Sequence, residues 1–280
     1  MPPIHEVAVA GFAEGTNDLY DKARPSYPDE TLDALFASLP SKDSLNVLEL
    51  GSGTGIFTRA LLTHRSFGPA VRELKAVEPS RGMREAFLKA VSDPRVSTYE
   101  GSFELTRVPD GWADLIVIAQ AWHWCPDFNK AMFEFSRSLK PEGVVAFIWN
   151  MEDRDSAQWV AQVRDLYEAE EMGTPQYRLG LWRQTFDTEG YKKHFATKEE
   201  LWLKRNLPTT DVGVIDRVLS KSHIAVLADE RKHEIRTRIQ AILTRGNDKV
   251  WINEAGAVFE YPYTTHLVII KHKSASGSDD

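Results

Sequence analysis

Short apolar runs alternate with segments of helical pattern along the first 150 residues. The apolar runs lie at residues 45–50, 74–79, 96–99, 113–120 and 144–150. Between them we expect helices at 28–39, 54–63, 80–91 and 128–139, and a turn at 140–143. Strands that are apolar on both faces and alternate with helices predict a parallel sheet covered on both sides.

The remainder of the chain has a different pattern. Residues 151–245 are mainly helical in pattern and more polar, with a strand expected around 200–206, and residues 258–272 have the composition of a closing strand. No linker separates two folding units, so residues 1–272 are expected to form one domain. Within it, 16–150 form the core and 151–245 an added helical layer over the active site, while the small polar tail at 273–280 is expected to be disordered.

Composition and charge narrow the possible partners. The chain has 280 residues, 42% hydrophobic and 27% charged, with a net charge of −7. An acidic balance argues against nucleic acid as the main partner. Nothing at the N-terminus resembles a signal peptide, and runs such as 267–270 are too short to span a membrane. We therefore expect a cytoplasmic protein, with the monomer favoured.

The stretch VLELGSGTG at residues 47–55 ends an apolar run in alternating glycines. The dinucleotide fingerprint is G-x-G-x-x-G, but here Gly51, Gly53 and Gly55 leave Ile56 where that fingerprint requires glycine. A pyrophosphate would also be disfavoured by the carboxylate of Glu49 beside the helix start. The spacing therefore disfavours an NAD-dependent oxidoreductase.

Two carboxylates suit a ligand that is both a nucleoside and a cation. S-adenosylmethionine has a sulfonium, an amino group and no phosphate, so Glu49 can offset its positive charge. Glu78 ends the second apolar run, 23 residues after Gly55, where a carboxylate can accept both ribose hydroxyls. These acids, the glycine loop and a third loop, GSFE at 101–104, form an ordered combination that predicts an S-adenosylmethionine site.

Several stretches together resemble a known family. They are YDKARPSYP (20–28), VLELGSGTG, AVEPSRGM (76–83), GSFE, AQAWHW (119–124) and LKPEG (139–143). The chain resembles class I S-adenosylmethionine-dependent methyltransferases. More narrowly, it is similar to relatives of trans-aconitate methyltransferase, including fungal enzymes that methylate carboxylates or natural-product thiols. It departs from them at Glu142, where a second glycine is usual, and at Phe103, where a smaller residue is common.

The resemblance implies a Rossmann-like α/β fold with a mostly parallel, seven-stranded sheet and helices on both faces. It also implies roles for individual residues. Gly51, Ser52, Gly53, Thr54 and Gly55 would contact the methionine part and the ribose. The remaining cofactor contacts would come from Tyr20, Arg24, Glu49, Glu78, Pro79, Met83, Ser102, Phe103, Gln120 and Ala121.

The stretch AWHWC follows the fourth strand, where an acceptor would meet the methyl group. Trp122, His123 and Trp124, with Trp149 from the fifth strand, are the expected substrate-pocket residues. His123 is either a general base or an anchor for the loop. Cys125, the only cysteine, has no evident activating partner and is expected to be a packed thiol.

The expected activity is methyl transfer to a small molecule, without a metal, because no histidine, cysteine and acid cluster has ligand spacing. The favoured acceptor is the thiol of a natural product, because only Arg24 and Arg183 suggest themselves as ligands for an acid and the aromatic-rich helical layer suits an apolar molecule. A carboxyl O-methyltransferase is the alternative. A nucleic-acid or protein methyltransferase is disfavoured, while a non-catalytic cofactor-binding protein stays open.

Overall fold

The computed structural model describes residues 21–273, in which one sheet runs through the molecule in the order β3-β2-β1-β4-β5-β8-β6. Strands β1 (Leu45–Leu50), β2 (Val71–Val77), β3 (Val96–Tyr99), β4 (Ala113–Ala119) and β5 (Leu139–Glu152) are parallel. β8 (Val258–His272) pairs antiparallel with β5, with β6 (Phe195–Thr209) and with the short β7 (Trp251–Asn253). The predicted, mostly parallel sheet is confirmed. It has seven strands in this order and an eighth short strand, β7, that pairs with β8.

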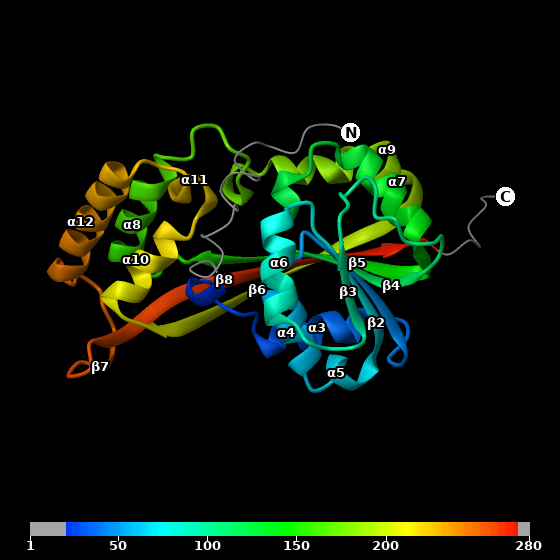
Figure 1. Ribbon diagram of the computed structural model, residues 1–280, viewed down its shortest axis with the longest axis horizontal. Coiled ribbons are helices and arrows are strands. Elements are labelled where there is room, and N and C mark those ends of the chain that lie inside the picture. The colour runs from blue at the N-terminus through cyan, green and yellow to red at the C-terminus, as the bar shows by residue number, and fades with distance from the viewer. Residues whose placement is uncertain (1–20, 274–280) are drawn as a thin grey trace.

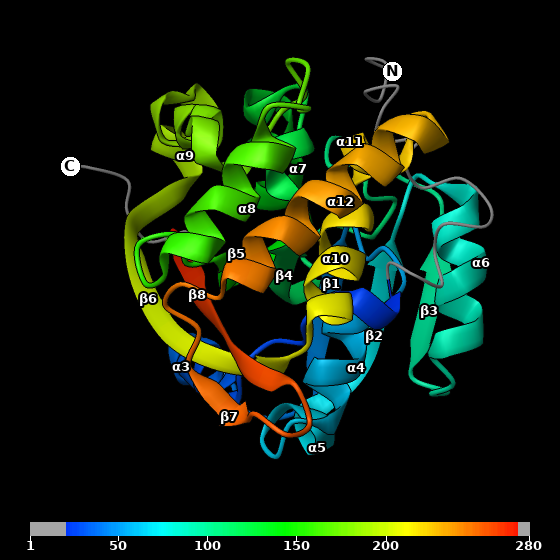
Figure 2. The ribbon, with the colours of Figure 1, turned by 90° about the vertical axis from the view of Figure 1, so that its left-hand side faces the viewer.

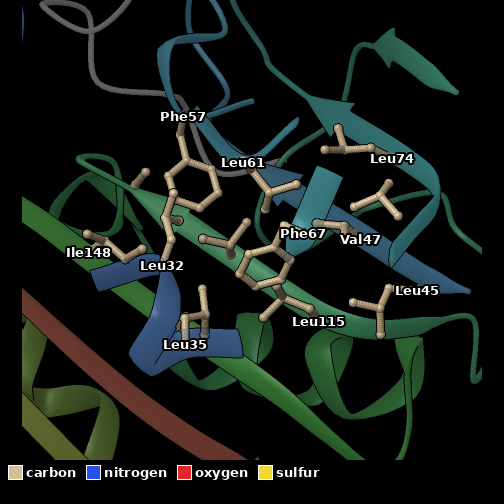
Figure 3. Packing of buried hydrophobic residues seen from close by; sticks show 14 of the residues in the cluster. Leu32, Leu35, Leu45, Val47, Phe57, Leu61, Phe67, Leu74, Leu115 and Ile148 are labelled. Carbon is tan, nitrogen blue, oxygen red and sulfur yellow. The ribbon is translucent and has the colours of Figure 1, made fainter. Parts of the chain in front are cut away.

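Both faces of the parallel part are covered because its strands are apolar in both directions. Every residue of β1 and of β4 is buried. On one face, α3 (Asp29–Ser38), α4 (Ile56–Thr63) and α5 (Phe67–Ala70) contribute Leu32, Leu35, Phe57, Leu61 and Phe67 to a common core (Figure 3). On the other face, α7 (Phe128–Ser138) packs through Met132 and Phe135.

The three antiparallel strands extend beyond this core and support the helical layer. β5, β8 and β6 are 14, 15 and 15 residues long, whereas β1 has six. Figures 1 and 2 show α8 (Gln158–Glu168), α10 (Asp211–Leu219) and α12 (Asp229–Arg245) gathered at this far end. They share a separate core around Trp159, Val218, Ile239 and Phe259. The expected helical layer is therefore built on an extension of the same sheet.

The differences from the predicted elements are local. The short helix α5 and the hairpin of β7 and β8 were not predicted. Strand β6 is longer than the strand expected at 200–206. The remaining helices are α6 (Arg81–Ala90), α9 (Glu189–His194) and α11 (Ser222–Ala225), with short 3₁₀ turns at Trp122–Trp124, Tyr177–Leu179 and Leu181–Asp187. No helix within residues 21–273 has both the length and the apolar character needed to cross a bilayer. Tyr20 and most of the predicted tail lie outside the described residues.

Residues 140–143 were predicted to form a turn, but they lie within β5, where its pairing with β4 is irregular, and one of them is strained. Glu142 is exposed and has φ 62°, in the left-handed region that glycine tolerates best. Glu142→Gly should therefore stabilise the protein by up to about 1 kcal/mol, because relief of the left-handed strain outweighs the added freedom of the unfolded chain. The free energy of unfolding in urea measures this effect. The control is Glu199→Gly, at an exposed position of β6 that is not in the left-handed region; this variant should destabilise the protein. Equal losses of unfolding free energy in both variants would show that Glu142 is not strained.

Candidate functional site

The glycine loop follows the carboxyl end of β1 and continues into α4. Gly51, Gly53 and Gly55 have φ values of 69°, 54° and 84°. A Cβ on Gly51 would lie 2.5 Å from Cβ of Ala121, whereas a Cβ on Gly53 would meet no atom of residues 21–273 within 4 Å. Glycine is therefore required at 51 by close packing as well as by backbone conformation, and the space beside Gly53 is open to a ligand.

Glu78 joins this loop to the loop after β2. Its Oε2 accepts a hydrogen bond from the Gly53 amide at 3.0 Å, and its Oε1 accepts one from the Ser80 amide at 2.9 Å. Burial raises the pKa of Glu78 above its ordinary value, and the two amide hydrogen bonds oppose that shift. Each carboxylate oxygen keeps a further lone pair. Glu78 is thus held rigidly and can still accept hydroxyl groups.

Glu49 is the more deeply buried acid, with 1% of its surface exposed. Its carboxyl accepts a 2.5 Å hydrogen bond from the hydroxyl of Thr58 on α4. Burial raises its pKa to about 8, against the opposing effect of that hydrogen bond, and Glu78 adds to the rise. A cation bound beside the loop would stabilise the ionised form of Glu49, as expected for a sulfonium cofactor.

The two hydroxyl side chains of the loop differ in their partners. Thr54 donates to Asp21 at 2.7 Å, and Arg59 donates to the same carboxylate oxygen at 2.7 Å. These bonds hold the segment before α3 against the loop. The Ser52 hydroxyl is buried and has no hydrogen-bond partner within residues 21–273. A buried hydroxyl without a partner is costly, so Ser52 fits a polar ligand at this loop.

The residues expected at the nucleoside surround the same loop. Pro79 follows Glu78, and its carbonyl accepts a hydrogen bond from Arg84. Met83, in the first turn of α6, is 2% exposed. Ser102 closes a small loop through paired backbone bonds with Leu105. Phe103 contacts Trp122 edge-on at 5.4 Å between ring centroids and lies 3.9 Å from a Cβ built on Gly51. These residues and the acids fit S-adenosylmethionine.

A separate cavity of about 110 Å³ opens on the β4–β5 side of the loop. Gln120, just after β4, has φ 59°, and its amide nitrogen donates to the carbonyl of Asn150 on β5 at 2.6 Å. Both residues line the cavity, as do His123 and Trp124. In the sheet order, β4 lies between β1 and β5. The cavity therefore lies beside the predicted cofactor site, where an acceptor is expected.

The proton on His123 is fixed by Trp149. The indole nitrogen of Trp149, which can only donate, gives a 3.3 Å hydrogen bond to Nδ1 of His123. Burial, and then the positive charge of Arg24, lower the pKa of His123 to about 3. The ring is therefore neutral with its proton on Nε2, so His123, which lines the cavity, can donate a hydrogen bond but cannot remove a proton.

The tryptophans predicted at the pocket occupy different positions. Trp124 lines the cavity, whereas Trp122 and Trp149 are fully buried behind its wall. Trp122 stacks on Phe147 and donates to the Thr185 hydroxyl at 2.9 Å. Cys125 is 7% exposed, and burial raises the pKa of its thiol. That environment suits a packed thiol rather than a nucleophile.

The far wall of the cavity is charged, contrary to the apolar pocket expected from the aromatic side chains of residues 159–202. Glu152, near the end of β5, is 3% exposed and accepts a 3.1 Å hydrogen bond from Tyr167. Arg217 of α10 lies 2.9 Å from its carboxylate, and Lys221 lies 3.2 Å away. Burial alone would raise the pKa of Glu152, but Arg217 and Lys221 overcome burial and lower it. Trp159 and Trp182 instead fill the cores, whereas Tyr167 and Tyr177 line the cavity.

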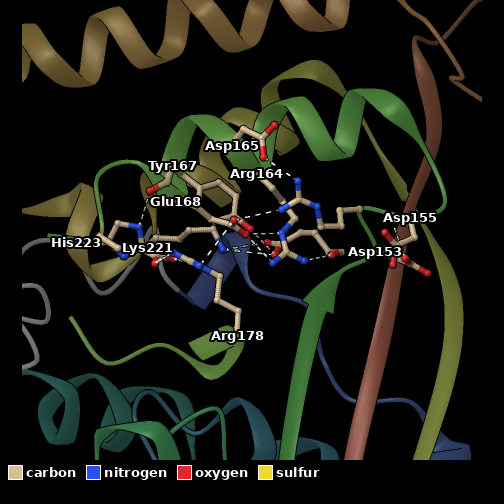
Figure 4. A network of polar contacts seen from close by, with 12 residues as sticks. Asp153, Asp155, Arg164, Asp165, Tyr167, Glu168, Arg178, Lys221 and His223 are labelled. Atoms are coloured by element: carbon tan, nitrogen blue, oxygen red, sulfur yellow. Dashed lines mark hydrogen bonds and ion pairs between the residues drawn. The ribbon is translucent and has the colours of Figure 1, made fainter. Parts of the chain in front are cut away.

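Further ion pairs line the outer part of this wall. Arg164 bonds Glu168 at 2.6 Å, and Arg178 bonds Glu171 (Figure 4). Arg24, predicted to cover the cofactor, also lines the cavity and donates to the Ser220 carbonyl at 3.1 Å. The second arginine expected at the pocket, Arg183, does not line this cavity. It pairs with Glu200 at 2.9 Å, because Glu200 on β6 faces it.

Residues 48–147 match the family model of a methyltransferase domain. An uncharacterised methyltransferase of Bacillus cereus is 30% identical over 193 residues, which are 66% of this chain and 85% of that protein. An uncharacterised methyltransferase-like protein of Schizosaccharomyces pombe is 29% identical over 174 residues, 62% of this chain. The chain spans only 64% of the length of that second relative.

Solved structures share the fold. The YcgJ protein of Bacillus subtilis aligns over 89% of this chain and all of its own, with a TM-score of 0.53 and 22% identity. A phosphoethanolamine N-methyltransferase of Haemonchus contortus, solved with phosphomonomethylethanolamine and S-adenosylhomocysteine, aligns over 92% of this chain and 56% of its own. Its TM-score is 0.50 and its identity 14%.

Substitution of Glu78 tests the cofactor site. Glu78→Ala should weaken S-adenosylhomocysteine binding by about 1–3 kcal/mol, because it removes charged hydrogen bonds to the ribose. Calorimetric titration measures this, with NAD as the ligand expected not to bind. Glu73→Ala is the control, because Glu73 lies on β2, which ends just before Glu78, and its side chain is 42% exposed; this variant should bind normally. An unchanged affinity in Glu78→Ala would mean that another residue holds the ribose.

A further prediction concerns proton release by Glu49. At pH 7 its carboxyl, with a pKa of about 8, is mostly protonated. A bound cation lowers that pKa, so S-adenosylmethionine binding should release a proton, and calorimetry in buffers of different ionisation enthalpy measures it. Glu49→Gln should abolish the release. An equal release from wild type and Glu49→Gln would place the cation away from Glu49.

The same group predicts a change in stability without cofactor. The folded pKa of about 8 lies above the ordinary 4.5, so ionisation of Glu49 opposes folding. The stability that protonated Glu49 contributes to the folded state is fully present below pH 4.5 and is lost as the pH rises through 8. Glu49→Gln should therefore melt at a higher temperature than wild type at pH 8.5 and show less difference at pH 5. The reverse order would contradict the raised pKa.

Proposed function

This chain belongs to the class I S-adenosylmethionine-dependent methyltransferase family, and we propose that it methylates a small molecule whose accepting atom arrives as an anion. The observation that carries this proposal is the hydrogen bond from Trp149 to Nδ1 of His123. It leaves His123 without the ability to act as a base. His223, the other histidine among the described residues that line the cavity, is bonded through Nε2 to the Tyr167 carbonyl, and burial lowers its pKa to about 3. An acceptor that needs no base then suits the cavity best.

The cofactor supplies an electrophilic methyl group on a positively charged sulfur. The chain's own contribution is to bind, orient and exclude water. Glu78 and the glycine loop hold the nucleoside, and Glu49 balances the positive charge. Gln120 fixes the end of β4 against Asn150 of β5, so the acceptor meets a rigid edge. The Nε2–H of His123 donates a hydrogen bond to the acceptor and orients it.

A carboxylate and a thiolate both satisfy this requirement, since neither needs a base near neutral pH. The charged wall favours the carboxylate, because Arg24, Arg178 and Arg217 all line the cavity. This reverses the preference for a natural-product thiol drawn from the sequence. The thiolate is the second candidate, supported by the aromatic rings of Trp124 and Tyr177, which line the same cavity. The resemblance to the trans-aconitate group stays a prediction.

A pH profile separates these two acceptors. With saturating cofactor, turnover of a carboxylate should be flat from pH 6 to 9, because the carboxylate titrates near pH 4 and His123 near pH 3. Turnover of a thiol should rise toward its pKa of about 8.5. Labelled S-adenosylmethionine with a panel of carboxylic acids, thiols and phenols measures both profiles. Turnover of phenols alone would overturn the anionic acceptor.

Substitution of His123 tests its role as a donor. His123→Gln keeps a donor nitrogen and should lower kcat by less than about tenfold, whereas His123→Phe removes the donor and should cost more. Both variants must first be shown to bind S-adenosylhomocysteine like wild type. Equal losses above a thousandfold in both, with no rescue at high pH, would make His123 an essential base and move the acceptor to a hydroxyl group.

A further inference from the structure

The buried carboxylate of Glu152 has two cations and needs only one. Arg217 and Lys221 both lie within 3.2 Å of it, and their side chains are only 3% and 11% exposed. The same lobe contains a buried lysine with a single acid: Lys249, 3% exposed, lies 2.8 Å from Asp211. A pair built only to hold the helical layer would resemble Lys249 and Asp211. The additional cation beside Glu152 therefore requires another explanation.

Arg217 has an unused donor at the same place. Its Nε donates to the Tyr263 hydroxyl at 3.1 Å, and its Nη2 lies 2.9 Å from Glu152. Its Nη1 is buried and has no hydrogen-bond partner within the described part of the chain. An unsatisfied guanidinium nitrogen is costly to bury, and a guanidinium presents paired donors that match a carboxylate. Arg217 lines the cavity, so a ligand there can supply the missing acceptor.

Lys221 completes the arrangement from the next turn. Its ammonium lies 3.9 Å from the centroid of the Tyr167 ring, which holds the stem in place. Lys221 lines the same cavity as Arg217. Burial, and then the positive charge of Arg217, lower the pKa of Lys221 well below its ordinary value. When Lys221 is protonated, Glu152 counts as −1 and the two cations as +1 each, so this group carries one surplus positive charge that an anion would stabilise. A buried surplus charge is stable only when an opposite charge is supplied.

We propose that Arg217 and Lys221 bind a carboxylate of the acceptor that is distinct from the atom that is methylated. This inference rests on the proposed function, and it assigns a specificity site at the helical layer. The two ends of the acceptor are separated along β5. Gln120 bonds to Asn150, and the cations bond to Glu152, two residues further on, which is about 7 Å along a strand. The acceptor is therefore a small molecule with a nucleophilic atom at one end and a carboxylate about 7 Å away.

Matched acids and esters test the site. The probes are ω-mercapto acids with two to six methylene groups, dicarboxylic acids of four to eight carbons, and the methyl esters of each at the remote carboxyl. Methyl transfer from labelled S-adenosylmethionine gives kcat/KM for each. Wild type should prefer the acid over its ester by at least tenfold at the best chain length. This preference should fall below about threefold in Lys221→Met, which leaves Arg217 and Glu152 as a single pair.

Lys249→Met is the matched control, because it removes an equally buried lysine from an ion pair outside the cavity. It should keep the wild-type preference for the acid. A general loss of stability would lower turnover of acid and ester together and leave their ratio unchanged. Loss of the preference in Lys249→Met as well, or an ester preferred by wild type, would overturn the site.

The outcomes also separate this inference from the proposed function. If S-adenosylhomocysteine binds and esters are methylated as well as acids, the carboxylate site is wrong and the methyltransferase stands. If no probe is methylated, calorimetric titration of the same acids and esters into the S-adenosylhomocysteine complex decides. Acid binding that is lost in Lys221→Met supports the site without turnover, and equal binding of acid and ester, or none, overturns it. Failure to bind S-adenosylhomocysteine contradicts the proposed function itself.

Discussion

The buried carboxylate of Glu152 is the constraint on which the second half of the molecule depends. An ionised acid with 3% exposure near the end of β5 must be compensated. Its compensation comes from Arg217 on α10, from Lys221 just beyond it and from Tyr167 on α8. These three contacts draw the helical layer onto the extended sheet and enclose the cavity between them. The buried carboxylate of Glu152 therefore helps to explain both the position of the helical layer and the polarity of the cavity.

The parallel core could be predicted from the sequence because its signals are local. The strands at 45–50 and 96–99 match β1 and β3, since an apolar run ended by a turn needs no distant partner to be recognised. The positions of Glu49 and Glu78 beside the glycine loop follow from the same parallel order. Gln120, Ala121 and Phe103 also lie together because each follows a strand of that sheet. The spacing of apolar residues along the chain is therefore enough to predict which residues follow the strands at this edge of the sheet.

The charged wall could not be predicted, because no spacing joins its members. Glu152 and Arg217 are 65 positions apart, and they meet only because β5 and β8 extend beyond the core and carry α8 and α10 with them. The aromatic residues of 151–245 gave a misleading signal, since Trp159 and Trp182 fill cores behind the wall. The proton on His123 was equally hidden, because it depends on Trp149 from another strand. An alternation of charge and aromatic residues does not reveal which of them faces a cavity.

The two proposed sites differ in charge, and the proposed reaction gives that difference a use. Acids lie beside the glycine loop, where the cofactor would bring a cation, whereas the cavity proposed for the acceptor is lined by more cations than acids. When an anion attacks a sulfonium, both charges disappear as the new bond forms. Such a reaction is slowed by water, which stabilises the separated ions more than the transition state, and a dry site removes that penalty. In the proposed reaction a neutral His123 donor would position the anion without protonating it, whereas a charged histidine would stabilise the ground state. Binding the acceptor through a second, remote carboxylate then places the strong electrostatic attraction away from the reacting atom, so that the binding energy orients the nucleophile without lowering its reactivity.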